Sequence, residues 1–173
     1  MAAFEGVGLD GFNGLSDDRA EQALLACCAS PAWVREVGAG RPYQDADQLF
    51  RAADDALARL GEDDVDDALA GHPRIGERPD TEWSSREQSG TADADAETRR
   101  RLAEGNRAYE DRFGHVYLVC ATGRRAEELL AVLEERLDND PETERAIVRA
   151  ELGKINRIRL QKLLQDAGRE DES

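Results

Sequence analysis

Two side chains in one stretch of this chain could carry out acid–base chemistry without a cofactor: the imidazole of His72 and the carboxylate of Glu87. His72 lies in a loop rich in glycine and proline, and the following Pro73 favours an extended, stiff backbone at the histidine. An imidazole titrates near neutral pH, so a histidine held in a fixed position is a good candidate for a general acid or base. The alternative interpretation is an ordinary surface histidine.

The residues around Glu87 form a helix-start motif, in which Ser84, Ser85 and Arg86 precede the glutamate and Gln88 follows it. In a capping box the serine accepts a hydrogen bond from the glutamate amide, and the glutamate side chain reaches back. Capping alone is one interpretation of this motif. The other is a ligand site, because the free amides and positive dipole end of a helix attract anions.

A third candidate is Arg159, which lies inside an apolar stripe near the end of the chain. Helical spacing places it between Ile155 and Leu163, with Val148 and Leu152 on the same face. A guanidinium that points into a core keeps its charge and needs an anion or several acceptors. It would bind a substrate carboxylate or carbonyl group, unless an internal salt bridge or an outward-turned side chain satisfies it.

The elements that must position these residues are predicted to be helices. Apolar periodicity indicates an all-α, single-domain helical bundle over residues 1–168, with a frayed polar tail at 169–173. Helices are expected at 16–28, from Asp45 or Asp47 to Leu60, at 62–70, after Ser84, and at 95–113, 124–137 and 141–166. Asp140 and Pro141 begin the last helix as its N-cap and first residue.

Two stretches interrupt this helical pattern. Ser30-Pro31 is predicted to stop the first helix, and Arg41-Pro42-Tyr43 is a break. Val116–Ala121 is short, rich in β-favouring residues and bounded by glycines. One such segment cannot form a sheet, so it is either a buried extended connector or the start of a buried helix.

Composition sets the broad class of the protein. The net charge of −15 argues against a nucleic-acid or anionic-membrane partner, and only Lys154 and Lys162 are lysines. An acidic, lysine-poor surface is typical of salt-loving sources; a genome that favours arginine codons would explain the missing lysine but not the excess of acid. Without an apolar span or a signal peptide, a cytoplasmic location is expected.

Several kinds of site are missing from the sequence. The three cysteines, Cys27, Cys28 and Cys120, have no metal-ligand spacing and are predicted to be reduced and buried. The sequence contains no HExxH, no paired CxxC, no GxxxxGK[ST] and no GxGxxG that follows a strand. We therefore expect neither a metal nor a cofactor.

An ordered set of motifs runs along nearly the whole chain and resembles one enzyme family. The motifs are Ala29-Ser-Pro-Ala-Trp-Val34, Arg41-Pro42-Tyr43, His72-Pro73, Ser84-x-x-Glu87-Gln88, Asn106-x-x-Tyr109-x-x-Arg112-Phe113-Gly114, Val116–Ala121, Arg136-Leu-x-Asn139 and Lys154-Ile155-x-x-x-Arg159. Together they resemble the OHCU decarboxylases, which act on 2-oxo-4-hydroxy-4-carboxy-5-ureidoimidazoline (OHCU) at the end of uric-acid degradation and give (S)-allantoin and carbon dioxide.

The resemblance implies an all-α, cofactor-free enzyme that binds a small-molecule substrate and is a homodimer. It implies that His72 is the catalytic acid and Glu87 its partner. The residues implied to line the substrate are Pro73, Ser84, Ser85, Arg86, Gln88, Tyr117, Leu118, Val119, Cys120, Ala121 and Arg159. Tyr117 departs from the phenylalanine of many relatives, which is expected to alter packing only.

Two other functions compete with this one. An acidic helical interaction module would leave Arg159 in an internal salt bridge and Glu87 as a plain cap. Hydrolysis of a ureide would need a metal or a nucleophile that the sequence does not offer. The decarboxylase is the hypothesis that the residues favour.

Overall fold

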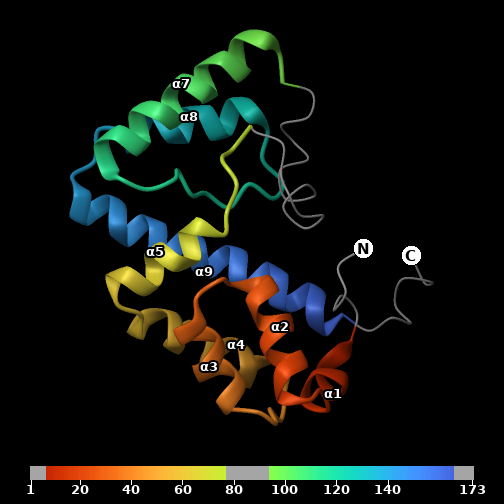
Figure 1. The fold of residues 1–173 in the computed structure, drawn as a ribbon. Helices are drawn as coiled ribbons and strands as arrows, with labels where there is room; N and C mark the ends of the chain where they lie inside the picture. The colour runs from red at the N-terminus through yellow and green to blue at the C-terminus, as the bar shows by residue number, and fades with distance from the viewer. Residues whose placement is uncertain (1–6, 77–93, 166–173) are drawn as a thin grey trace. The chain divides into compact units, whose positions relative to one another are not determined.

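The computed structural model describes residues 7–76 and 94–165 of this 173-residue chain, and these residues form helices joined by loops, without a strand among them (Figure 1). The helices are α1 (Gly8–Asn13), α2 (Asp17–Cys27), α3 (Pro31–Ala39), α4 (Ala46–Arg59), α5 (Glu62–Ala70), α7 (Ala96–Phe113), α8 (Ala126–Arg136) and α9 (Pro141–Leu164). The chain divides into two compact units, unit 1 (Met1–Ala68 and Gly153–Ser173) and unit 2 (Leu69–Leu152). The all-α prediction is confirmed.

Short polar side chains begin most of these helices, as expected for residues that accept a hydrogen bond from a free amide of the first turn. Ser16 begins α2 in this way, and Asp45 begins α4 by accepting from the Gln48 amide at 2.7 Å. Asp95 accepts from the Thr98 amide at 2.7 Å at the start of α7. Asp140 accepts from the Thr143 amide at 2.8 Å, which confirms the predicted start of α9.

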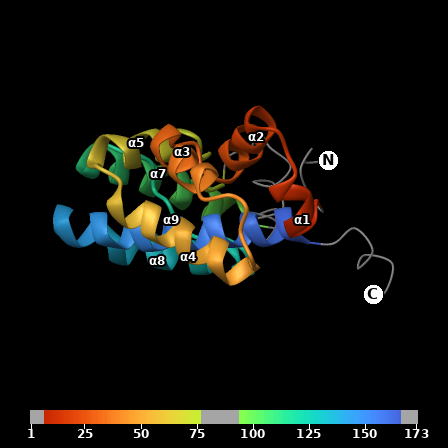
Figure 2. The same cartoon turned by 90° about the horizontal axis from the view of Figure 1, so that it is seen from below.

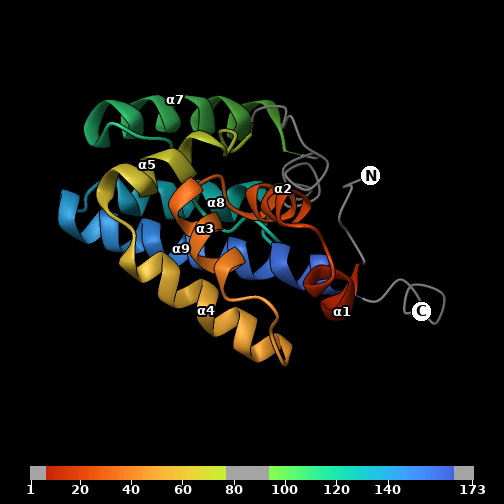
Figure 3. The same cartoon turned by 60° about the horizontal axis from the view of Figure 1, so that its bottom comes forward.

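Trp33 lies in the core of unit 1. Its ring is fully buried, and its Nε1 donates a hydrogen bond to the Ala53 carbonyl at 3.1 Å. This bond joins α3 to α4, and α2 packs on α3. Figure 2 shows α1 beside the C-terminal end of α9, where the Val7 amide donates to the Leu163 carbonyl. In Figure 3, α4 runs next to α9, and Arg157 bonds Asp54 at 2.9 Å. The C-terminal part of α9 is therefore an integral part of unit 1.

Unit 2 contains its own core between α7 and α8. Its buried side chains include Leu102, Tyr109, Tyr117, Val119, Leu129, Leu130 and Leu133. A Cβ atom at Gly105 would lie 2.6 Å from Cδ2 of Leu133, so the glycine lets Leu133 pack against the backbone of α7. Arg101 and Glu134 add an ion pair of 2.5 Å between the same two helices at the surface.

Two helices near the N-terminus, α3 and α1, are missing from the sequence prediction. The pattern predicts that Ser30-Pro31 stops the first helix, and α2 does end before them, at Cys27. The pattern does not predict that a new helix begins there, where Ser30 accepts from the Trp33 amide and Pro31 occupies the first turn of α3. Proline suits the first turn because the backbone N–H groups of that turn have no partner within a helix. The short α1 is not predicted because six residues give too little periodicity.

The segment Val116–Ala121, called the connector below, is neither a helix nor a strand. Tyr117, Leu118, Val119 and Ala121 are all buried. Of the two possibilities left open by the sequence, the structure supports the buried connector. The thiols of Cys27 and Cys28 are buried as predicted, whereas Cys120 in the connector is partly buried.

The acidic surface predicts that salt stabilises the fold. At a net charge of −15, like-charge repulsion favours the expanded chain, and salt screens that repulsion. We expect the melting temperature in molar KCl to exceed that in low salt, as followed by circular dichroism. Replacing two exposed carboxylates in the D55N/D67N variant should raise the melting temperature at low salt and reduce the gain from KCl. A melting temperature that falls in molar KCl would contradict this explanation.

Candidate active site

His72 lies two residues after the end of α5, in unit 2. Its amide donates to the Leu69 carbonyl at 3.0 Å, which forms the turn that follows the helix, and the residue is half-buried. Two contacts from α7 hold the loop after it. The Asn106 amide Nδ2 donates to the Ile75 carbonyl at 2.9 Å, and Arg74 pairs with Glu110 at 2.8 Å. The histidine therefore belongs to a loop that is fixed at both sides.

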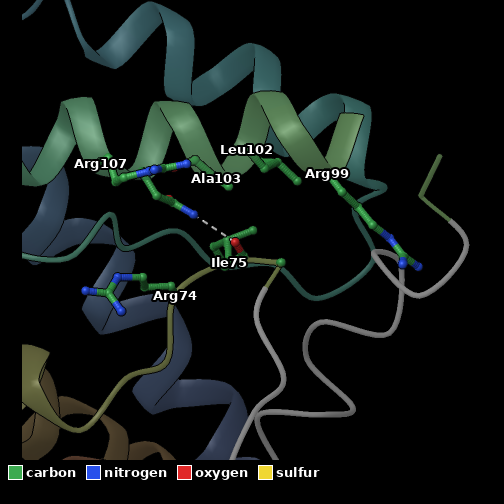
Figure 4. Close-up of a pocket in the computed structure, with 8 residues that line it drawn as sticks. Arg74, Ile75, Arg99, Leu102, Ala103 and Arg107 are labelled. Carbon is green, nitrogen blue, oxygen red and sulfur yellow. Dashed lines mark hydrogen bonds between the residues drawn. The ribbon is translucent and has the colours of Figure 1, made fainter. Parts of the chain in front are cut away.

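A cavity of about 370 Å³ lies between this loop and α7 (Figure 4). The loop contributes Arg74, Ile75 and Gly76, and α7 contributes Arg99, Leu102, Ala103, Asn106 and Arg107. The dashed line in Figure 4 marks the bond from Asn106 to Ile75. The sequence did not predict this cavity, because the loop at Arg74 and the residues of α7 are far apart in the chain and share no motif.

The connector is held by hydrogen bonds to two helices, α8 and the N-terminal part of α9. Its Leu118 carbonyl accepts a hydrogen bond from Nη1 of Arg136, on α8, at 2.7 Å. The hydroxyl of Tyr117 donates to the Leu129 carbonyl at 3.0 Å. The Cys120 amide donates to Glu151, on α9, at 3.3 Å. Without these bonds, the backbone groups that they pair would be buried without a hydrogen-bond partner, which would lower the stability of the fold.

Arg136 is paired with Glu144 beneath the connector, and both side chains are almost fully buried. Nε of the guanidinium lies 2.9 Å from Oε2 of the carboxylate, and Nη2 lies 2.5 Å from the same oxygen. The Tyr109 hydroxyl also donates to Glu144. The guanidinium lies over the ring of Tyr117, 5.0 Å from its centroid. Each buried charge therefore has a partner of opposite sign, as buried charges require.

Burial and this charge pair shift the pKa values of the groups around it. Burial and the hydrogen bond to Glu144 raise the pKa of Tyr109. Burial also raises the pKa of Tyr117, although the Arg136 guanidinium opposes the shift. Burial acts to lower the pKa of Arg136, but the hydrogen bonds and charge of Glu144 raise it overall. Both tyrosines are thus neutral hydrogen-bond donors and Arg136 is a permanent cation at neutral pH.

Arg159 belongs to unit 1, on the C-terminal part of α9. It is 6% exposed, so the prediction that this arginine points into a core is confirmed. Its Nη1 lies 3.4 Å from the carbonyl oxygens of Ala26 and Cys27, at the end of α2. Burial raises the pKa of the neighbouring Cys28 thiol, and Arg159 partly offsets this effect. The guanidinium of Arg159 is therefore next to carbonyl oxygens, which are the kind of acceptor that a buried arginine needs.

The predicted site residues are distributed over both units. His72, Pro73 and the connector lie in unit 2, whereas Arg159 lies in unit 1. Ser84, Ser85, Arg86, Glu87 and Gln88 lie outside the described residues. The chain's other histidine, His115, packs its ring against Tyr109 and Phe113, with centroids 5.5 and 6.3 Å away.

Within residues 7–76 and 94–165, no group of three or more histidine, cysteine, aspartate and glutamate side chains could hold a metal ion. None of the described helices is both long and apolar enough to cross a membrane.

Comparison with known proteins gives a consistent result. The family model for OHCU decarboxylase matches residues 13–161. The chain is 29% identical to the uric acid degradation bifunctional protein TTL of Arabidopsis thaliana, over 84% of this chain and 48% of that protein. It therefore spans about half the length of that bifunctional relative. It is 32% identical to the 2-oxo-4-hydroxy-4-carboxy-5-ureidoimidazoline decarboxylase of Mus musculus, over 78% of this chain and 79% of the mouse protein.

A solved structure also matches the fold. The crystal structure of an OHCU decarboxylase in the presence of (S)-allantoin superposes with a TM-score of 0.73. The two chains are 28% identical, and the match covers 87% of this chain and 99% of the other.

The Tyr117 hydroxyl gives a first test of the connector. If this residue acts through packing alone, Tyr117→Phe should leave stability unchanged. Because the hydroxyl donates to the Leu129 carbonyl, we expect the free energy of unfolding to fall by about 1 kcal/mol in urea titrations. A Tyr117→Phe variant as stable as the wild type would show that this bond contributes nothing.

Proposed function

This chain belongs to the OHCU decarboxylase family, and from that premise we propose that it converts OHCU to (S)-allantoin and carbon dioxide without a cofactor. The observation that carries the proposal is the family match over residues 13–161, which includes residues of both units. The matching crystal structure with (S)-allantoin, the proposed product, supports the same reaction. The enzyme would thus be a carboxy-lyase of uric acid degradation.

The substrate supplies the electron acceptor that a decarboxylation needs. Its carboxylate is attached to a ring carbon next to a C=N bond. When the bond between that carbon and the carboxylate breaks, carbon dioxide leaves, the electron pair forms a double bond between the two ring carbons, and the nitrogen of the C=N bond takes up a proton. The hydroxyl on the carbon that lost carbon dioxide then releases its proton and becomes the carbonyl of allantoin, while the neighbouring ring carbon, which carries the ureido group, is protonated and becomes the stereocentre. The protein must therefore orient the carboxylate and deliver one proton, which are tasks for positioned side chains.

We assign the proton donor to His72. Its half-buried position in a loop fixed by Asn106 and Arg74 supports this role, because a proton donor must hold a constant geometry. Glu87 would orient the imidazole or accept the proton of the substrate hydroxyl. Delivery of the proton from one side gives a single enantiomer of allantoin.

The remaining predicted residues would bind the substrate. Arg159 would meet its anionic or carbonyl edge, and the near-complete burial of this guanidinium favours the role. The connector, Pro73 and the Ser84–Gln88 turn would line the ring and the ureido group. Carbonyl and N–H groups of the substrate match the backbone and amide groups that these segments carry.

We propose further that the enzyme is a homodimer and works in the cytoplasm. The family resemblance supports the dimer.

The activity is tested on OHCU made freshly from urate by an oxidase and a hydroxyisourate hydrolase. We expect the ultraviolet absorbance of OHCU to decay faster with the protein than without it, in low or in molar salt. Only the uncatalysed decay, from protein shown to be folded in both salts, would support the acidic binding module instead.

The assignment of the catalytic pair is tested by His72→Ala and Glu87→Ala. General acid–base catalysis contributes about 10²–10⁴-fold, so we expect kcat to fall by that order in each variant while the circular dichroism spectrum is retained. Asp55→Ala is the control, because it removes an exposed carboxylate of α4 that has no role in the proposed site, and it should keep the wild-type kcat. Wild-type rates in both alanine variants would disprove this mechanism.

A further inference from the structure

The connector is a buried backbone segment without the regular hydrogen bonds of a helix or a sheet. Its conformation therefore depends on individual side chains. Of the bonds described above, the one from Arg136 to the Leu118 carbonyl is the shortest, at 2.7 Å, and comes from a charged donor. Bonds from ionised donors are the stronger kind. Arg136 is thus the main support at the centre of the segment.

The guanidinium can give this support because its other nitrogens are fixed. Nε and Nη2 bind Glu144, which leaves Nη1 aimed at the Leu118 carbonyl. The planar fork makes the three directions rigid with respect to one another. A change in the position of Glu144 would therefore move the donor that holds the connector.

Glu144 is in turn held by three elements. It lies in the first turn of α9, where the helix dipole favours a negative charge. The Tyr109 hydroxyl donates to it from α7, and the Asn139 amide does so at 3.3 Å from the loop before α9. Glu144 is fully buried, so water does not compete for these bonds. A shift of α7 or α9 would therefore move the Glu144 carboxylate and, with it, the guanidinium of Arg136.

We infer that Arg136, oriented by Glu144 and Tyr109, is a positioning residue that sets the Leu118 carbonyl and with it the substrate-facing backbone of the connector. This inference rests on the proposed function, in which the connector lines the substrate. Stability alone does not require an ion pair here, because apolar residues of similar size often replace a buried pair without loss. The bond to the Leu118 carbonyl is what such a replacement would remove.

The test uses the full-length triple variant Y109F/R136M/E144L, which removes the whole polar cluster and leaves no unpaired buried charge. Amide hydrogen exchange of residues 117–121 is measured first, followed by kcat, KM and the dissociation constant of (S)-allantoin. We expect faster exchange in the connector and a kcat/KM about 10- to 100-fold lower, mostly through KM, with weaker (S)-allantoin binding. The pH profile of kcat should keep its shape, because His72 and Glu87 are unchanged.

The control is R101M/E134L, which neutralises the exposed ion pair between α7 and α8 with the same substitutions. It should keep wild-type exchange in the connector and a wild-type KM. If the triple variant fails to fold, R136K replaces it, because lysine keeps the charge but cannot reach Glu144 and Leu118 as a rigid fork. We expect the same changes, smaller in size.

Wild-type exchange in the connector would overturn the inference, and so would faster exchange with unchanged KM and (S)-allantoin affinity. A wild-type protein that does not accelerate OHCU decay would instead refute the proposed function. In that case the exchange rates and (S)-allantoin binding still decide whether Arg136 positions a ligand-binding segment.

Discussion

The buried contact between Arg136 and Glu144 is the interaction on which the arrangement of unit 2 depends. It joins α8 to the first turn of α9, receives the Tyr109 hydroxyl from α7, and extends through Nη1 to the Leu118 carbonyl. A guanidinium and a carboxylate that are both out of contact with water tolerate little displacement, because either charge alone would be costly to bury. Three helices and one irregular segment are therefore tied to a single geometry. An apolar contact would restrict their positions less, since it has no preferred direction.

Such rigidity is consistent with the proposed chemistry. In a cofactor-free decarboxylation the substrate itself accepts the electron pair, so the protein contributes orientation and one proton. Both contributions require that the distances between the substrate and the protein's side chains stay constant. The His72 loop illustrates this, because Asn106 and Glu110 of α7 fix it at Ile75 and Arg74. In unit 1 the buried Arg159 is held by carbonyl groups at the end of α2.

Local patterns in the sequence were enough to predict much of this structure. The apolar stripe around Arg159 predicted its burial, because helical spacing is fixed by covalent geometry. Asp140 marked a helix start, since a cap acts on amides only two or three residues away. Ser30 and Pro31 correctly marked the end of the preceding helix, but the start of α3 at the same residues was missed, because a Ser-Pro pair is compatible with either a stop or a start. The partnership of Arg136 with Glu144 and the Leu118 carbonyl could not be predicted, because tertiary packing alone brings them together. The relation of Glu87 to His72 stays a prediction, as Glu87 lies outside the described residues.

The proposed function requires that this chain decarboxylates OHCU and controls the face on which the ring carbon is protonated. The decisive measurement is the circular dichroism of the allantoin formed from fresh OHCU, recorded together with the ultraviolet decay. We expect accelerated decay and the signal of a single allantoin enantiomer. Racemic allantoin formed at the uncatalysed rate, by folded protein in low and in molar salt, would contradict it.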